Sequence, residues 1–137
     1  MREILFRGKR TDDGEWVEGY YSYSPEIDKH MITTADLAHP FGTNFGFYKV
    51  IPETVSQFTG LTDKNGRKVF EGDIVKIVDT FNGIIRGVVC WCNGAFWADC
   101  TPTYGEYCFY GIDYLPVEII GNIYDNPELL KGGNDNG

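Results

Sequence analysis

Basic side chains are scarce in this sequence. Twelve lysines and arginines stand against 20 aspartates and glutamates in 137 residues, which gives a formal net charge of −8 at pH 7. A field of that sign repels phosphate backbones and anionic lipid surfaces. The composition therefore disfavours nucleic acid as a partner. It would suit a protein partner with basic groups, but solubility alone is the favoured explanation of such a charge.

Long apolar runs and phosphate-binding glycine motifs are also missing. No stretch approaches the roughly 20 apolar residues of a membrane span, and the first residues lack the apolar core of a secretory signal. We therefore expect a cytoplasmic protein with no membrane partner. No Gly-x-Gly-x-x-Gly or Gly-x-x-x-x-Gly-Lys element opens a helical pattern, so we expect no nucleotide and no other cofactor.

Histidine occurs only twice, at His30 and His39. The spacing of these residues indicates no Ser-His-Asp triad and no Cys-His dyad, although His39 and a cysteine could lie close together in the folded chain. We interpret both histidines as loop residues with satisfied hydrogen bonds, and we expect no catalytic residues, with an enzyme as the least favoured alternative. Paired-carboxylate chemistry needs a defined separation, so four carboxylates are read as solvated charges: Asp99, Glu106, Asp113 and Glu118.

Cysteines are few and clustered, at Cys90, Cys92, Cys100 and Cys108. Structural zinc sites usually draw thiolates from pairs separated by two residues, and that spacing is absent here. On a strand Cys90 and Cys92 would share a face and supply two ligands, but the remaining ligands would have to converge from elsewhere. We predict small core thiols without metal and, in a reducing compartment, without disulfides.

Glycine and aromatic residues, by contrast, are abundant. The 17 glycines and an aromatic fraction of 15% favour short strands and many turns, and hence a mainly β fold. Asp63-Lys64-Asn65-Gly66 is the strongest hairpin signal, because Asn-Gly readily adopts the left-handed torsions of tight turns. Asn82-Gly83 and Asn93-Gly94 predict two further turns in an antiparallel meander.

Alternation between these turns predicts the strands. They cover residues 4–9, 15–23, 31–34, 67–70, 74–78, 84–92, 95–100, 104–110 and 117–124. Residues 55–58 fit either a strand or one helical turn, and residues 24–46 are expected to be a partly irregular excursion. Gly121 predicts a bulge or close crossing. Asn126 is the expected cap of a short helix, and residues 131–137 are expected to be disordered.

Three separated segments resemble the YopX family of small bacteriophage and prophage proteins. They are residues 2–7 (REILFR), 57–75 (QFTGLTDKNGRKVFEGDIV) and 117–130 (VEIIGNIYDNPELL). The resemblance implies an N-terminal β subdomain at residues 1–60, an SH3-like β-barrel at 61–130, and a phage or prophage origin. It implies no known activity. The run of short strands in the second half also looks like an SH3-like barrel when taken by itself.

Aromatic side chains gather in that second half, and SH3-like barrels bind peptides or nucleic acid through such residues. If Cys90 and Cys92 face the core, alternation places Trp91 outside. The candidate interface comprises Trp91, Tyr107 and Tyr110. The alternative interpretation is that these rings fill the core and pack the two subdomains.

The sequence thus predicts a non-catalytic module that binds a host or phage protein. A second hypothesis is nucleic-acid binding through the basic hairpin residues Lys64, Arg67 and Lys68. A third is self-assembly into homo-oligomers through exposed strand edges and aromatic groups.

Overall fold

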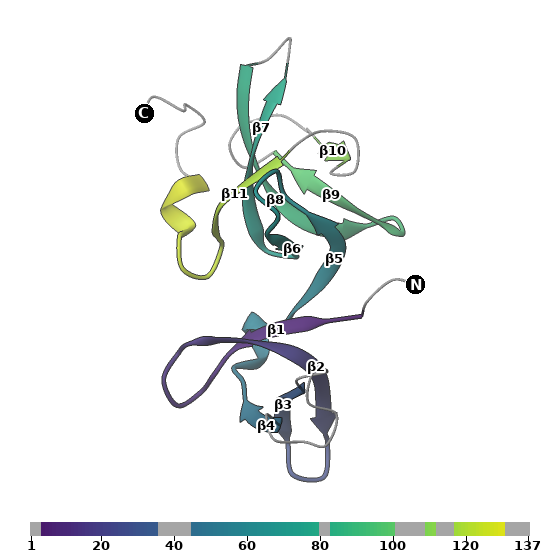
Figure 1. Cartoon of the computed structure of the whole chain (residues 1–137), viewed down its shortest axis with the longest axis vertical. Coiled ribbons are helices and arrows are strands. Elements are labelled where there is room, and N and C mark those ends of the chain that lie inside the picture. The colour runs from purple at the N-terminus through teal and green to yellow at the C-terminus, as the bar shows by residue number, and fades with distance from the viewer. Residues whose placement is uncertain (1–3, 36–44, 80–82, 101–108, 112–116, 131–137) are drawn as a thin grey trace. The chain divides into compact units, whose positions relative to one another are not determined.

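The computed structural model describes residues 4–35, 45–79, 83–100, 109–111 and 117–130, which form antiparallel β-sheets and two short 3-10 helices (Figure 1). The expectation of a mainly β fold is confirmed. By contacts the chain divides into two compact units, Met1–Phe58 and Thr59–Gly137. Among the described residues, no helix has the length and apolar character needed to cross a membrane.

The first unit is built on four sequential antiparallel strands, and β5 (Ser56–Thr62) begins beside the first of them. Ile32 and Val50 form its buried centre. A side chain at Gly19 would place its Cβ 2.2 Å from the Thr33 carbonyl oxygen, so the close approach of the strands requires glycine there. The four strands are β1 (Phe6–Lys9), β2 (Trp16–Ser24), β3 (Lys29–Ala35) and β4 (Phe45–Lys49).

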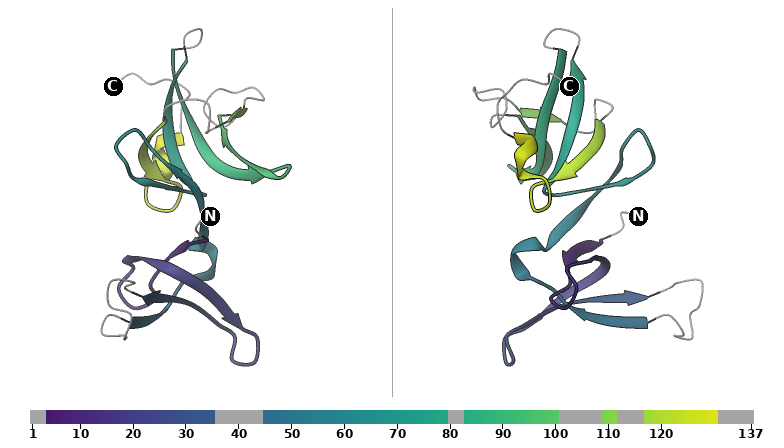
Figure 2. Two further views of the ribbon diagram at one scale, coloured as in Figure 1. Left: turned by 45° about the vertical axis from the view of Figure 1, so that its right-hand side comes forward. Right: turned by 90° about the vertical axis from the view of Figure 1, so that its left-hand side faces the viewer.

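Three expectations for this unit need correction or completion. The third strand runs from Lys29 and is longer than expected. β4 is not among the predicted strands, and its first two residues fall at the end of the region expected to be irregular; β3 and β4 are paired in register (Figure 2, right). β4 consists of three aromatic residues, which favour strands, a glycine and a lysine, and it pairs with β3 along its whole length. The ambiguity at residues 55–58 resolves as a strand, since β5 begins at Ser56. A 3-10 turn, η1 (Pro52–Thr54), lies just before them.

The second unit contains a five-stranded sheet in the order β10-β9-β8-β7-β11, and the later part of β5 forms a hairpin with β6. Val75, Ile77, Ile85 and Val89 lie in its core, and Val69 of β6 joins the same cluster. The described residues show no closed barrel. The strands are β6 (Lys68–Phe70), β7 (Asp73–Asp79), β8 (Gly83–Cys92), β9 (Ala95–Asp99), β10 (Phe109–Gly111) and β11 (Val117–Asn122).

The structure tests several expectations for single turns and bulges of this unit. The register shift between Ile119 and Gly121 confirms the expected irregularity at Gly121. The C-terminal helix is a 3-10 turn, η2 (Pro127–Leu130). Asn126 stands at the expected cap position, where its backbone carbonyl accepts the N–H of Leu129, and its side-chain oxygen accepts the backbone N–H of Asn122 at 3.2 Å. Asn82 of the expected Asn82-Gly83 turn lies outside the described residues, whereas Gly83 has a left-handed φ of 77°. Most of the strand expected at 104–110 and the tail also fall outside them.

Candidate interaction surfaces

Trp91 stands at the tip of the β8–β9 hairpin. The connecting residues Asn93 and Gly94 have φ values of 52° and 80°, the left-handed torsions that a two-residue turn between twisted strands requires. Trp91 pairs with Phe96 across the hairpin, with ring centroids 4.7 Å apart and an interplanar angle of 69°. The ring is thus braced on one side, while 51% of the residue remains exposed.

The reason for this exposure differs from the one expected. Val89 is buried, and Trp91, two residues further along the strand, shares its face. Cys90 and Cys92 lie on the opposite face and are half-buried. The premise that these two cysteines face the core is therefore wrong. Trp91 is exposed because the hairpin tip extends past the last buried pair, Val89 and Ala98.

The thiols show no metal geometry in the part of the chain that is described. No group of three or more His, Cys, Asp or Glu side chains there could hold an ion. Cys100 is fully buried, as expected of a core thiol, whereas Cys108 lies outside the described residues. Burial, reinforced by the neighbouring Asp99, raises the pKa of Cys90, so this thiol is a weak nucleophile at neutral pH.

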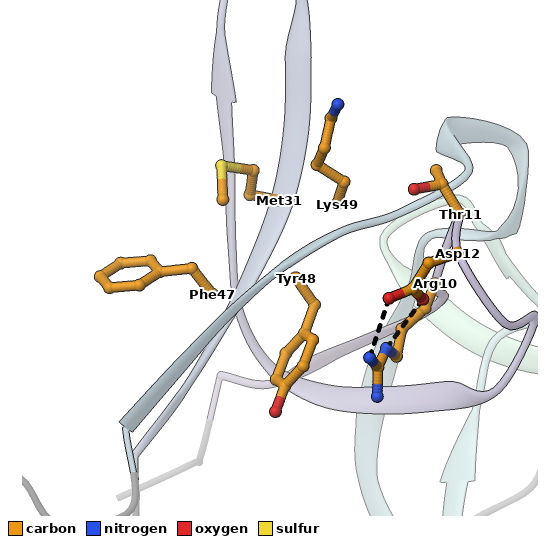
Figure 3. A pocket seen from close by; sticks show the side chains of 7 residues that line it. All are labelled: Arg10, Thr11, Asp12, Met31, Phe47, Tyr48 and Lys49. Carbon is orange, nitrogen blue, oxygen red and sulfur yellow. Dashed lines mark hydrogen bonds and ion pairs between the residues drawn. The ribbon is translucent and has the colours of Figure 1, made fainter.

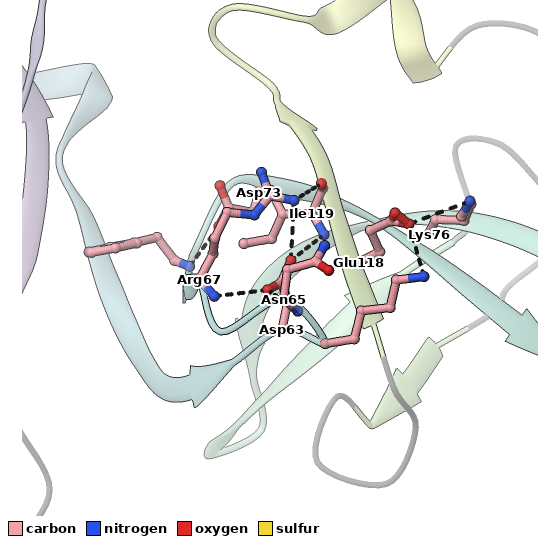
Figure 4. Close-up of polar contacts among 9 residues, drawn as sticks. Asp63, Asn65, Arg67, Asp73, Lys76, Glu118 and Ile119 are labelled. Atoms are coloured by element: carbon pink, nitrogen blue, oxygen red, sulfur yellow. Dashed lines mark hydrogen bonds and ion pairs between the residues drawn. The ribbon is translucent and has the colours of Figure 1, made fainter.

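The predicted basic hairpin is organised by a buried acid (Figure 4). Oδ1 of Asp63 accepts the backbone N–H groups of Asn65 and Arg67, both at 2.9 Å, and Oδ2 accepts the N–H of Ile119 at 3.1 Å. Burial disfavours the charged carboxylate, but these hydrogen bonds outweigh burial and hold the pKa of Asp63 below its ordinary value. Asp63 therefore ties the turn to β11.

The cations of this hairpin are largely engaged in the fold. The Arg67 guanidinium donates to Asp63 at 3.3 Å and to the Ile119 carbonyl oxygen at 2.6 Å. Lys64 lies 3.3 Å from Glu118, which also pairs with Lys76 at 3.5 Å. Glu118 is thus an ion-paired residue and not the solvated charge that was expected. Phosphate binding at Lys64 and Arg67 would have to compete with these contacts.

The remaining sequence-derived candidates are placed as follows. Tyr107 and His39 lie outside the described residues, and of Tyr110 the structure describes the backbone, opposite Ala98 in β10. His30 lies in strand β3 and not in a loop. Its Nδ1 is 2.6 Å from the Tyr21 hydroxyl, and its ring stacks on Tyr23 at 4.3 Å.

A surface that sequence reasoning missed lies on the first unit, along β4 (Figure 3). A hollow of about 430 Å³ is lined in part by Met31, Phe47 and Lys49. A neighbouring hollow of about 200 Å³ shares Lys49 and adds Lys29 and His30. The sequence signal was weak because these residues come together through the pairing of β3 with β4.

Comparison with known proteins places the chain in a family. A crystal structure of protein EF1440 from Enterococcus faecalis is similar to it, with a TM-score of 0.50 and 22% sequence identity over 96% of this chain and 100% of that one. At that identity the likeness concerns the fold alone. No curated protein matches the chain. The family described as YopX protein matches residues 5–131, almost the whole length, and the chain therefore belongs to the YopX family.

Proposed function

We propose that this chain is a non-catalytic, phage- or prophage-encoded protein of the bacterial cytoplasm that binds another protein through the tip of the β8–β9 hairpin. The observation that carries the proposal is the half-exposed Trp91 near the end of β8, beside the two-residue turn. Tryptophan is enriched among the residues that dominate binding energy, and a ring held by Phe96 loses little conformational entropy on association.

An SH3-like arrangement of the second unit is part of this proposal. The β5–β6 hairpin contributes Val69 and Leu61 to the core of the five-stranded sheet, as the strands of a small barrel would. In such an arrangement the Trp91 hairpin is a projecting connection between strands. Connections of this kind commonly carry recognition residues on a rigid scaffold.

Site-directed photo-crosslinking tests the proposal. A photoreactive amino acid is placed at position 91 and, as a control, at exposed position 68, and adducts are identified after expression in a bacterial host carrying the related phage. The captured protein is then purified and titrated against the wild type and Trp91→Ala. We expect binding to weaken at least about 30-fold, the effect of losing a hot-spot tryptophan.

The control variant is Tyr23→Ala, an exposed aromatic residue in the other unit, and it should bind like the wild type. Equal affinity of wild type and Trp91→Ala would contradict the proposal. Crosslinks from position 91 to a second copy of this chain, with light scattering that rises with concentration, would favour self-assembly instead.

A further inference from the structure

The first unit presents a sheet face with aromatic and basic groups in rows. We call it the outer face and define it by Tyr20, Ser22, Lys29, Met31, Thr33, Phe47 and Lys49, whose side chains alternate with the buried Ile32 side of the sheet. Tyr20, Thr33 and Phe47 are directly opposite one another on β2, β3 and β4, and Ser22, Met31 and Lys49 form the next row.

The two rings of this face are accessible. Tyr20 is 54% exposed and Phe47 61% exposed. Neighbouring strands are about 4.8 Å apart, so rings on β2 and β4 stand roughly 10 Å apart across the sheet. Figure 3 shows Met31 and Lys49 on one side of the strands and Tyr48 on the other, directed toward Arg10.

The two cations of the face, Lys29 and Lys49, lie close to each other. Among the described residues, neither Lys29 nor Lys49 lies within ion-pairing distance of a carboxylate, whereas Arg10 is held by Asp12 at 3.0 Å. The ammonium of Lys49 lies close enough to that of Lys29 to lower the pKa of Lys29, and the nearby Asp28 offsets this only in part. An anion between the two lysines would relieve their repulsion.

We propose that the outer face binds single-stranded nucleic acid, with bases stacking on Tyr20 and Phe47 and phosphates beside Lys29 and Lys49. Proteins that bind single strands combine aromatic platforms with a positively charged track, and this face supplies both in a chain whose overall charge is −8. Lys49 is two residues from Phe47 on one strand, about 7 Å along it, which suits a phosphate next to a stacked base.

The same features argue against the other occupants. Exposed rings beside two lysines suit unstacked bases and their phosphates, whereas an apolar peptide would leave both ammonium groups without a counter-charge. Stacked base pairs in a duplex offer no free ring faces, and the acidic remainder of the chain repels a second strand. The proposal goes beyond the protein-binding function, because it concerns another unit and another class of partner.

Fluorescence anisotropy with labelled oligodeoxythymidylate of about 15 nucleotides tests the proposal. The full chain should bind this probe more tightly than the matching duplex, and affinity should fall between about 50 and 200 mM salt. Tyr20→Ala and Phe47→Ala should each weaken binding about tenfold, while Phe47→Trp should retain it. Lys49→Gln should reduce the dependence of log affinity on log salt by about 0.7.

Two matched controls separate this inference from the proposed function. Lys68→Gln removes a cation from an exposed position of the second unit, and Trp91→Ala removes the ring assigned to protein binding; both should leave oligonucleotide affinity unchanged. Because the outer-face rings are exposed, their variants should melt within a few degrees of the wild type, as a thermal scan can verify.

Any of three results would overturn the inference. The first is no binding of the single strand at low salt. The second is loss of binding with Lys68→Gln equal to that with Lys49→Gln. The third is tighter binding of a labelled acidic peptide of alternating Glu and Phe than of the oligonucleotide, which would assign the face to a protein.

Discussion

At the scale of single residues, Asp63 contributes most clearly to the fold of the second unit. Its two oxygens accept three backbone N–H groups from both sides of a hairpin and from β11, and also contact Arg67. The sequence predicted the turn from Asn65-Gly66 but gave no sign of the acid at its centre. One of the three backbone partners, Ile119, is 56 positions away, and local sequence patterns do not reveal such a contact.

Asp63→Ala should lower the free energy of unfolding by about 3 kcal/mol, because buried donors lose their acceptor. Urea denaturation of the variant and the wild type measures the difference. Asp12→Ala is the matched control: this acid pairs with Arg10 on the surface, where solvent screens the pair and its loss should change stability little. A loss for Asp63→Ala no greater than that of the control would refute the role assigned to Asp63.

Gly19 is a second residue with a defined steric role. The Cβ of alanine would meet the Thr33 carbonyl group at 2.2 and 2.9 Å, and backbone atoms cannot move aside without breaking the β2–β3 pairing. We expect Gly19→Ala to destabilise the first unit by at least about 2 kcal/mol, a typical cost of overpacking. Amide hydrogen exchange should quicken at β2 and β3. Unchanged exchange at these strands would show that the sheet accommodates the methyl group.

At the scale of elements, turn chemistry predicted the structure well and weakly patterned strands did not. Asn93-Gly94 needs left-handed torsions at two successive residues, and the structure has them. β4 escaped prediction because Gly46 and the nearby Gly42 are turn signals, although three of its five residues are aromatic and favour strands. The same holds for the candidate surfaces. The exposure of Trp91 could be predicted from the alternation of side chains, whereas the outer face of the first unit could be identified only from the register of three paired strands.

Gly94→Ala should destabilise the protein by about 1–2 kcal/mol, since alanine is strained at a φ of 80°. Gly94→Asn should cost less, because asparagine tolerates the left-handed region. Thermal melting of the two variants and the wild type gives the order of their stabilities. If alanine and asparagine were equally tolerated, the turn would have relaxed to another conformation and the fixed orientation of Trp91 would be lost.

At the scale of the whole molecule, acidity governs the response to pH. The pKa of Asp63 is lowered, because its hydrogen bonds to backbone N–H groups outweigh the effect of burial. The pKa of Glu118 is also lowered, first by Lys64 and then by Lys76. A carboxylate whose pKa is lower in the folded state contributes stability that is present above its unfolded pKa and lost as pH falls through the folded one.

The free energy of unfolding should therefore stay nearly level from pH 7 to about 5 and decline below about pH 4, where unfolded carboxylates begin to take up protons. Near the sequence pI of 4.6 the chain should be least soluble and still folded. Denaturation by urea across this range, with light scattering beside it, checks both expectations. Stability that rises on acidification below pH 4 would contradict the assigned pKa shifts.

The length of the β8–β9 turn has a consequence for variation in this family. A two-residue turn cannot take up an extra residue by itself, so one inserted residue would shift the strand pairing or create a bulge. A full one-residue slip of β8 would turn Trp91 to the side now held by Cys90 and Cys92. Relatives with a longer turn would present a different chemical surface at this tip, and a change of partner could then arise from a single codon insertion.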